Sequence, residues 1–174
     1  PPVLSGMVTW LFGTLILREY FEKKFTLLGS FMIAVLPCFI LQSRIGLESL
    51  LFLSTSTAAL YFMILSVRKE KWWLYGLTGC AFGISLYTYA VSYLVVPIFL
   101  VLMLSYLLYL KKLRWKYVLS MGVPLAILAA PLILMIIINT FELPEIATLY
   151  ITIPRLPEYR GPEVSLKNLL HNIP

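Results

Sequence analysis

The chain has 174 residues, of which 60% are hydrophobic and 13% are charged, and its formal net charge is +6. Soluble domains carry about a quarter charged residues and roughly half apolar ones, so the composition excludes an ordinary soluble domain and indicates a polytopic membrane protein. The positive charge does not point to a nucleic-acid partner, because the basic residues lie in short joints between apolar runs. Basic residues in such joints are typical of membrane proteins, in which they set the orientation of the spans.

Apolar runs predict an all-α transmembrane bundle of about six spans. A spanning helix needs roughly 20 apolar residues, with a range of about 17–25. In chain order the candidate spans are Val3–Leu17, Phe25–Leu41, Leu47–Ser66, Trp73–Tyr89, Leu94–Leu110 and Tyr117–Asn139. In the fourth span, Gly79 and Gly83 have the small-xxx-small spacing that allows a close approach between helices.

The joints between the spans predict the orientation in the membrane. Ten of the 14 basic residues lie in alternate joints, which by the positive-inside rule face the cytoplasm. The other joints and the tail from Phe141 then face the extracytoplasmic side. The ten are Arg18, Lys23, Lys24, Arg68, Lys69, Lys71, Lys111, Lys112, Arg114 and Lys116.

The composition changes at Phe141, after which proline and mixed charge become frequent. We expect residues 1–140 to form a partial transmembrane domain. Residues 141–174 would form an extracytoplasmic loop or the start of an outer soluble portion. Because the chain begins at Pro1 and stops within a polar segment, we expect it to be part of a longer protein.

Arg44 and Glu48 stand between two long apolar runs, in the stretch LQSRIGLESLLFL. If the third span starts near Ser43, their i,i+4 spacing places both side chains on one face of a helix, at the outer end of the bundle. One interpretation is an ion pair that neutralises itself at a helix start. The other is a functional site, in which the guanidinium binds a phosphate in a bidentate manner.

Other candidate residues are less specific. The tyrosines Tyr87, Tyr89 and Tyr93 fall at the outer boundary, where they either anchor the protein in the interface or contact a substrate. Arg155 and Arg160, in the segment IPRLPEYRGP, either belong to a solvated loop or receive an anion. The sequence has no Gly-rich phosphate loop and only one His, so it predicts no metal site among these residues.

Three segments carry a family resemblance: SGMVTWLFGTLILREYFEKKFTLLGSFMIAVLP, AVLPCFILQSRIGLESLLFLSTSTAALYF and KWWLYGLTGCAFGISLYTYAVSYLVVPIFL. The layout is a proline after a helix, then Ser-Arg, then an acid that leads into the next span. A Gly-rich span that ends in Tyr-x-Tyr follows. Over roughly residues 1–140 the chain resembles bacterial members of the protein O-mannosyltransferase and aminoarabinose lipid A transferase superfamily, which are membrane glycosyltransferases of the GT-C fold.

The resemblance implies an inverting hexosyl or pentosyl transfer from a polyprenyl-phosphate donor to an acceptor outside a bacterial plasma membrane. It implies that Arg44 and Glu48 lie near the donor phosphate, although many relatives have Asp in place of Glu48. The catalytic base of the family would lie in an outer loop before Pro1, so we expect the chain by itself to be inactive. No cofactor is certain, and a divalent metal stays open.

The residues alone leave two other classes of function open. A transporter or lipid flippase also needs a kinked helical bundle, but it predicts charges within the spans, and the interiors of these spans carry none. A non-catalytic membrane scaffold would need neither Arg44 nor Glu48.

Overall fold

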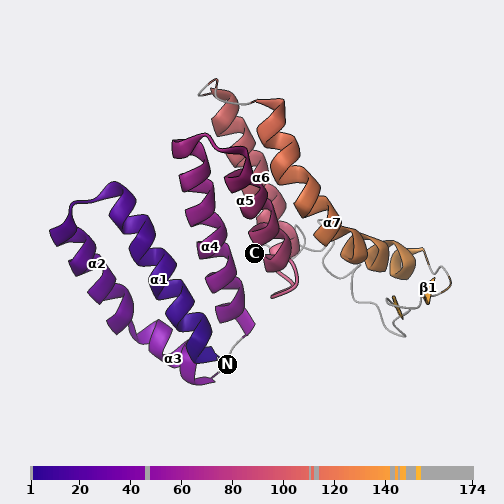
Figure 1. Cartoon of the computed structure of the whole chain (residues 1–174). Helices are drawn as coiled ribbons and strands as arrows, with labels where there is room; N and C mark the ends of the chain where they lie inside the picture. Colours follow the sequence, from indigo (N-terminus) through magenta and orange to yellow (C-terminus); the bar gives the residue numbers. More distant parts are fainter. Residues whose placement is uncertain are drawn as a thin grey trace, which may run out of the picture. The chain divides into compact units, whose positions relative to one another are not determined.

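The structure of the protein is a computed structural model, which describes residues 2–45, 48–109, 111, 114–141, 144, 146–147 and 152–153. It divides into two compact units, Pro1–Ala126 and Ile127–Pro174. Seven helices run through the described residues (Figure 1): α1 Pro2–Tyr20, α2 Lys23–Val35, α3 Pro37–Ile45, α4 Glu48–Lys69, α5 Trp72–Ser85, α6 Ser92–Tyr109 and α7 Trp115–Thr140. The predicted all-α membrane bundle is confirmed.

Three helices among the described residues are long and apolar enough to cross a membrane. They are α4, α6 and α7, and they correspond to the predicted third, fifth and sixth spans. The number of about six spans stays a prediction, since this comparison rests on the length and composition of the described helices alone. The helix α5 has 14 residues and is therefore about 21 Å long, shorter than the roughly 30 Å of a bilayer core.

The predicted span Phe25–Leu41 is broken into α2 and α3 at Leu36, which has φ −57° and ψ 118°. The cause is Pro37, whose ring disfavours the helical conformation in the residue before it. The helix α3 then starts with Pro37 at its first position, where the missing N–H costs no hydrogen bond.

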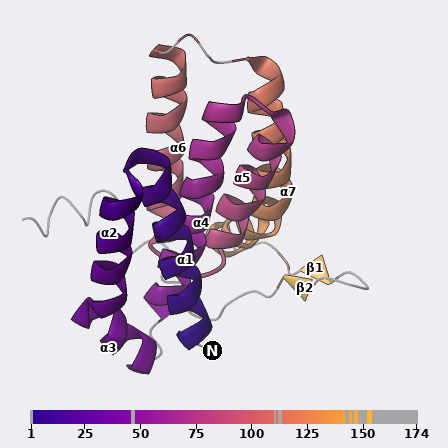
Figure 2. The ribbon, with the colours of Figure 1, turned by 60° about the vertical axis from the view of Figure 1, so that its left-hand side comes forward.

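Within the first unit, α1 packs against α2, α3 and α4, and α4 packs against α5. The helices α6 and α7 join this group through a core of Tyr75, Met103, Leu107, Tyr117 and Met121. The α1–α2 and α4–α5 joints, the end of α6 and the start of α7 lie at one end of the unit (Figure 2). The end of α3, the start of α4 and the α5–α6 joint lie at the other end.

Glycines allow α5 and α7 to pack closely. A Cβ added at Gly79 would overlap the backbone of Met121, at 2.9 Å from its carbonyl carbon, and one at Gly76 would touch Ser120 at 3.5 Å. The predicted close approach therefore occurs at Gly79, and Gly76 shares it.

The second unit contains the last part of α7 and a minimal antiparallel hairpin. Its strands are β1 Ile146–Ala147 and β2 Thr152–Ile153, in which Ile146 pairs with Ile153 and Ala147 with Thr152. The expected division into residues 1–140 and 141–174 concerns the membrane boundary and stays a prediction.

Candidate functional site

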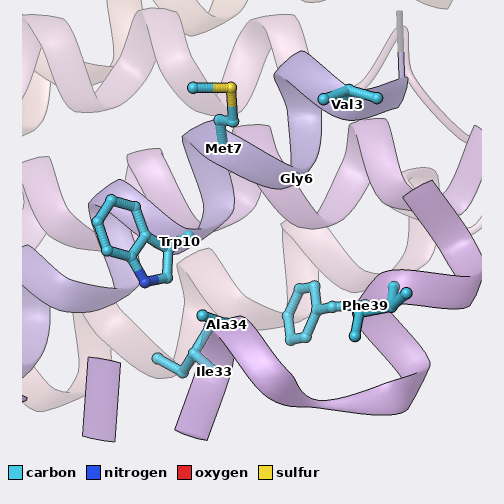
Figure 3. Close-up of a pocket in the computed structure, with 8 residues that line it drawn as sticks. Val3, Gly6, Met7, Trp10, Ile33, Ala34 and Phe39 are labelled. Atoms are coloured by element: carbon cyan, nitrogen blue, oxygen red, sulfur yellow. The ribbon is translucent and has the colours of Figure 1, made fainter. Parts of the chain in front are cut away.

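An apolar pocket of about 240 Å³ opens between α1, α2 and α3. Figure 3 shows Val3, Met7 and Trp10 along α1, with Ile33, Ala34 and Phe39 from the other two helices. Gly6 and Ile40 complete the lining. Gly6 has no side chain and Ala34 has only a methyl group, which leaves the space. Because this lining contains no charged group, the pocket suits an apolar ligand.

Hydrogen bonds between α1 and α2 hold one side of this pocket. The indole Nε1 of Trp10 donates to the carbonyl oxygen of Ser30 at 3.1 Å. One turn further along α1, the hydroxyl oxygens of Thr14 and Ser30 are 2.8 Å apart. In an apolar surrounding such bonds fix the two helices, since an unpaired hydroxyl there would be costly.

Arg44 lies in the last turn of α3, and its side chain is exposed. The pocket residue Ile40 precedes it by four positions, so both side chains project from the same face of α3. A cation near a helix C-terminus is also favoured by the helix dipole. The structure thus gives one short helix an apolar pocket at its start and an exposed guanidinium at its end.

The predicted placement of Arg44 and Glu48 on one helical face stays a prediction. The described part of α3 reaches Ile45 and that of α4 begins at Glu48, and residues 46 and 47 between them lie outside the described residues. The side chain of Glu48 lies outside the described residues.

The tyrosines of the α5–α6 connection lie at the same end of the first unit as the α3–α4 joint (Figures 1 and 2). Their side chains are exposed, with relative accessibilities of 51% for Tyr87, 39% for Tyr89 and 43% for Tyr93. A buried hydroxyl holds the connection, since Ser92 donates to the carbonyl oxygen of Leu86 at 3.1 Å. Within the last turn of α5, Ser85 donates to the carbonyl oxygen of Phe82 at 2.7 Å.

The other predicted candidates are not placed. Arg155 and Arg160 lie outside the described residues, so their relation to Arg44 and the tyrosines stays a prediction. Within the described part of the chain, no group of three or more His, Cys, Asp or Glu residues could hold a metal ion.

The pocket was not predicted from the sequence. Its lining consists of apolar residues from three helices, and nothing separates them from lipid-facing residues in a linear pattern. The one local signal is the occurrence of small residues, Gly6 and Ala34, within runs of large apolar side chains.

Comparison with known proteins bears on the function of this site. Residues 1–138 match the family described as dolichyl-phosphate-mannose-protein mannosyltransferase. No curated protein and no solved structure matches the chain. The match covers more than half of the 174 residues, which favours a transferase over a transporter or a scaffold. The chain therefore belongs to the dolichyl-phosphate-mannose-protein mannosyltransferase family, whose members are membrane glycosyltransferases that use a lipid-linked sugar donor.

Proposed function

We propose that the protein transfers a hexose or pentose from a polyprenyl-phosphate donor to an acceptor on the extracytoplasmic face of a bacterial plasma membrane. The observation that carries the proposal is the arrangement on α3, where the apolar pocket and the exposed Arg44 follow one another on one helix. A polyprenyl phosphate has the complementary layout, with an apolar chain that ends in an anionic group.

The pocket between α1, α2 and α3 would receive the part of the isoprenoid chain next to the phosphate. Burial of each apolar carbon there contributes about 0.8 kcal/mol if it leaves water. The gain is smaller if it leaves lipid, because lipid is equally apolar. The pocket therefore positions the chain more than it adds affinity, and the phosphate supplies the anchor.

Arg44 would bind the donor phosphate. Its planar guanidinium can offer two parallel N–H donors to two phosphate oxygens, which fixes both distance and direction. In an inverting transfer, the acceptor hydroxyl attacks the anomeric carbon from the side opposite the phosphate. The bond from that carbon to the phosphate oxygen breaks, and its electron pair stays on the polyprenyl phosphate. Arg44 would stabilise this growing negative charge.

Two roles in this mechanism belong to residues without a described side chain. Glu48 would orient the Arg44 guanidinium or share a divalent metal with another acid. The base that accepts the proton of the acceptor hydroxyl is expected in an outer loop before Pro1.

Tyr87, Tyr89 and Tyr93 would contact the sugar or the acceptor. They are exposed at the same end of the first unit as the α3–α4 joint, and aromatic rings offer an apolar face together with a hydroxyl. Arg155 and Arg160, in the segment after α7, would belong to a substrate loop and receive an anionic group.

The orientation follows from the basic joints. The joints α1–α2, α4–α5 and α6–α7 carry the clustered Lys and Arg residues and lie at one end of the first unit. By the positive-inside rule this end faces the cytoplasm. The Arg44 end and the tail from Phe141 then face outward, where the lipid-linked sugar would be used.

The test uses the whole protein in lipid vesicles with a radiolabelled sugar on polyprenyl phosphate. Arg44→Gln should lower kcat/KM at least about 100-fold, the range seen when one charge-stabilising donor is removed. Arg44→Lys should keep part of the activity, because it retains the charge but loses the bidentate geometry. Arg18→Gln, an exposed arginine at the other end of the unit, is the matched control. Unchanged transfer by correctly inserted Arg44→Gln protein would reject the assignment.

A further inference from the structure

A second charged surface lies at the end of the first unit opposite to Arg44. We call it the basic rim and define it by five exposed cations around the α4–α5 and α6–α7 joints: Lys69, Lys71, Lys111, Arg114 and Lys116. From Lys69 to Lys116 the sequence contains a single acidic residue, Glu70. The rim is therefore strongly positive, and neither the proposed donor site nor the sugar transfer makes use of it.

Cross-helix contacts hold the rim in a fixed arrangement. The phenol hydroxyl of Tyr117, at the start of α7, donates to the carbonyl oxygen of Glu70 at 2.8 Å. The hydroxyl of Ser120 donates to the carbonyl oxygen of Trp72 at 2.6 Å. The rings of Tyr75 and Tyr117 are stacked with centroids 4.5 Å apart. The first turns of α5 and α7 are thus fastened together, and their basic residues are presented side by side.

Two cations of the rim rest on aromatic rings instead of carboxylates. The guanidinium of Arg114 lies 5.9 Å from the centre of the Tyr117 ring, and the Nζ of Lys116 lies 6.0 Å from that of Trp72. Among the described residues the structure gives Lys71, Arg114 and Lys116 no carboxylate partner, whereas Arg68 is paired with Glu19. A cation over a ring is ordered without being neutralised, so it can still bind an anion.

The rim lies at the depth of lipid headgroups. The helices α4 and α6 are membrane-length and end at it, and the membrane-length helix α7 begins there. Three tryptophans surround it with exposed indole rings, at 56% for Trp72, 47% for Trp73 and 82% for Trp115. Exposed indoles at the end of a spanning helix are typical of the membrane interface.

We propose that the basic rim binds the phosphate headgroups of anionic phospholipids, with Lys71, Arg114 and Lys116 as the principal contacts. The charge complements an anionic lipid, and the neighbouring spans hold the rim against a bilayer surface, where each basic residue strengthens binding to anionic lipid about fivefold. This site is separate from the proposed donor site, so either proposal can fail without the other.

The experiment uses the whole protein in phosphatidylcholine nanodiscs, in which both faces meet lipid whatever the orientation. Brominated phosphatidylglycerol or brominated phosphatidylcholine is added in equal amounts, and the quenching of tryptophan fluorescence is compared. The ratio of the two quenching constants measures the preference for anionic lipid next to the indoles of the rim. We expect a ratio of at least about five for the unmodified protein.

The test variant combines Lys71→Gln, Arg114→Gln and Lys116→Gln and should lower the ratio at least about fivefold. The control variant combines Arg18→Gln, Lys23→Gln and Lys24→Gln, which removes the same charge from the α1–α2 joint at the same end, and should keep most of the preference. A charge-retaining variant with Lys71→Arg, Arg114→Lys and Lys116→Arg should also keep it, which separates loss of charge from misfolding.

Three results would overturn the proposal. The first is equal quenching by both lipids in the unmodified protein. The second is an equal loss in the control variant, which would mean that only the total charge of that end counts. The third is loss of the preference on addition of 10 mM inorganic phosphate at constant ionic strength, which would identify a site for free phosphate.

Discussion

The rings of Tyr75 and Tyr117 lie parallel, with centroids 4.5 Å apart and planes inclined by 7°. Tyr75 is in α5 and Tyr117 is in the first turn of α7, so the stack joins two helices that are more than 40 positions apart in the sequence. The same Tyr117 donates its hydroxyl proton to the carbonyl oxygen of Glu70. This contact anchors the corner between α4 and α5 and connects the packing of the bundle with the basic rim.

Tyr117→Phe should keep the stack and lose the hydrogen bond, which lowers the free energy of unfolding by about 0.5–1.5 kcal/mol. Tyr117→Leu should add a further loss of about 0.5–1.5 kcal/mol, because an aromatic pair is also removed. The free energies of unfolding of both variants are measured in detergent with increasing amounts of SDS. Tyr109→Phe, at a ring that is 82% exposed, is the control, and equal losses in Tyr117→Phe and Tyr109→Phe would contradict the role of the hydroxyl.

Gly79→Ala should separate α5 from α7, because its Cβ would overlap the backbone of Met121, which cannot move aside as a side chain can. Overpacking of this kind costs about 1–3 kcal/mol. Gly122→Ala is the matched control, since a Cβ there meets no atom within 4 Å. Thermal unfolding of the purified protein should show a lower midpoint only for Gly79→Ala. The prediction fails if both variants unfold alike.

The pair of Thr14 and Ser30 tests the α1–α2 contact beside the pocket. A double-mutant cycle with Thr14→Val and Ser30→Ala should give a coupling energy of about 0.6 kcal/mol, the average for hydrogen bonds between membrane helices. Thr55→Val is a control, because the Thr55 hydroxyl bonds only to carbonyl oxygens of its own helix, those of Leu51 and Phe52. A coupling energy of zero between Thr14 and Ser30 would mean that the bond does not fix the helices.

The ion pair of Glu19 and Arg68 joins the end of α1 to the end of α4, and Arg68 also lies 5.2 Å from the centre of the Tyr20 ring. Because both side chains reach solvent, Glu19→Gln should cost only about 0.2–1 kcal/mol, and the cost should shrink as salt is raised. Unfolding measured at low and at high salt distinguishes this from a buried pair, for which the loss would be larger and independent of salt.

Ala34→Phe should fill the pocket with a phenyl ring. The variant therefore tests whether the chain of the lipid donor needs this space. We expect the Kd for a long-chain polyprenyl phosphate to rise about tenfold, which corresponds to about 1.4 kcal/mol, while inorganic phosphate is unaffected. Ala126→Phe, at an exposed alanine of α7, is the control for the added ring. Equal affinity of the Ala34→Phe and unmodified proteins for the long-chain lipid would place the chain elsewhere.

Local features of the fold followed well from the sequence. Long apolar runs predicted α4, α6 and α7, and the basic joints predicted which connections lie at the same end. The span Phe25–Leu41 was predicted from its run of apolar residues as one span, and the structure divides it at Leu36, because Pro37 restricts the backbone of the residue before it.

The sequence by itself determined that the protein is a membrane-embedded helical bundle with one strongly basic end, since burial in lipid depends on composition and on run length. Only the tertiary structure decided which small residues contact a neighbouring helix and which line a pocket. Gly79 touches α7, whereas Gly6 and Ala34 line a pocket. The physical reason is that both properties depend on the distance between helices. That distance is set by the sum of many side-chain contacts across the bundle and leaves no mark in the local pattern of residues.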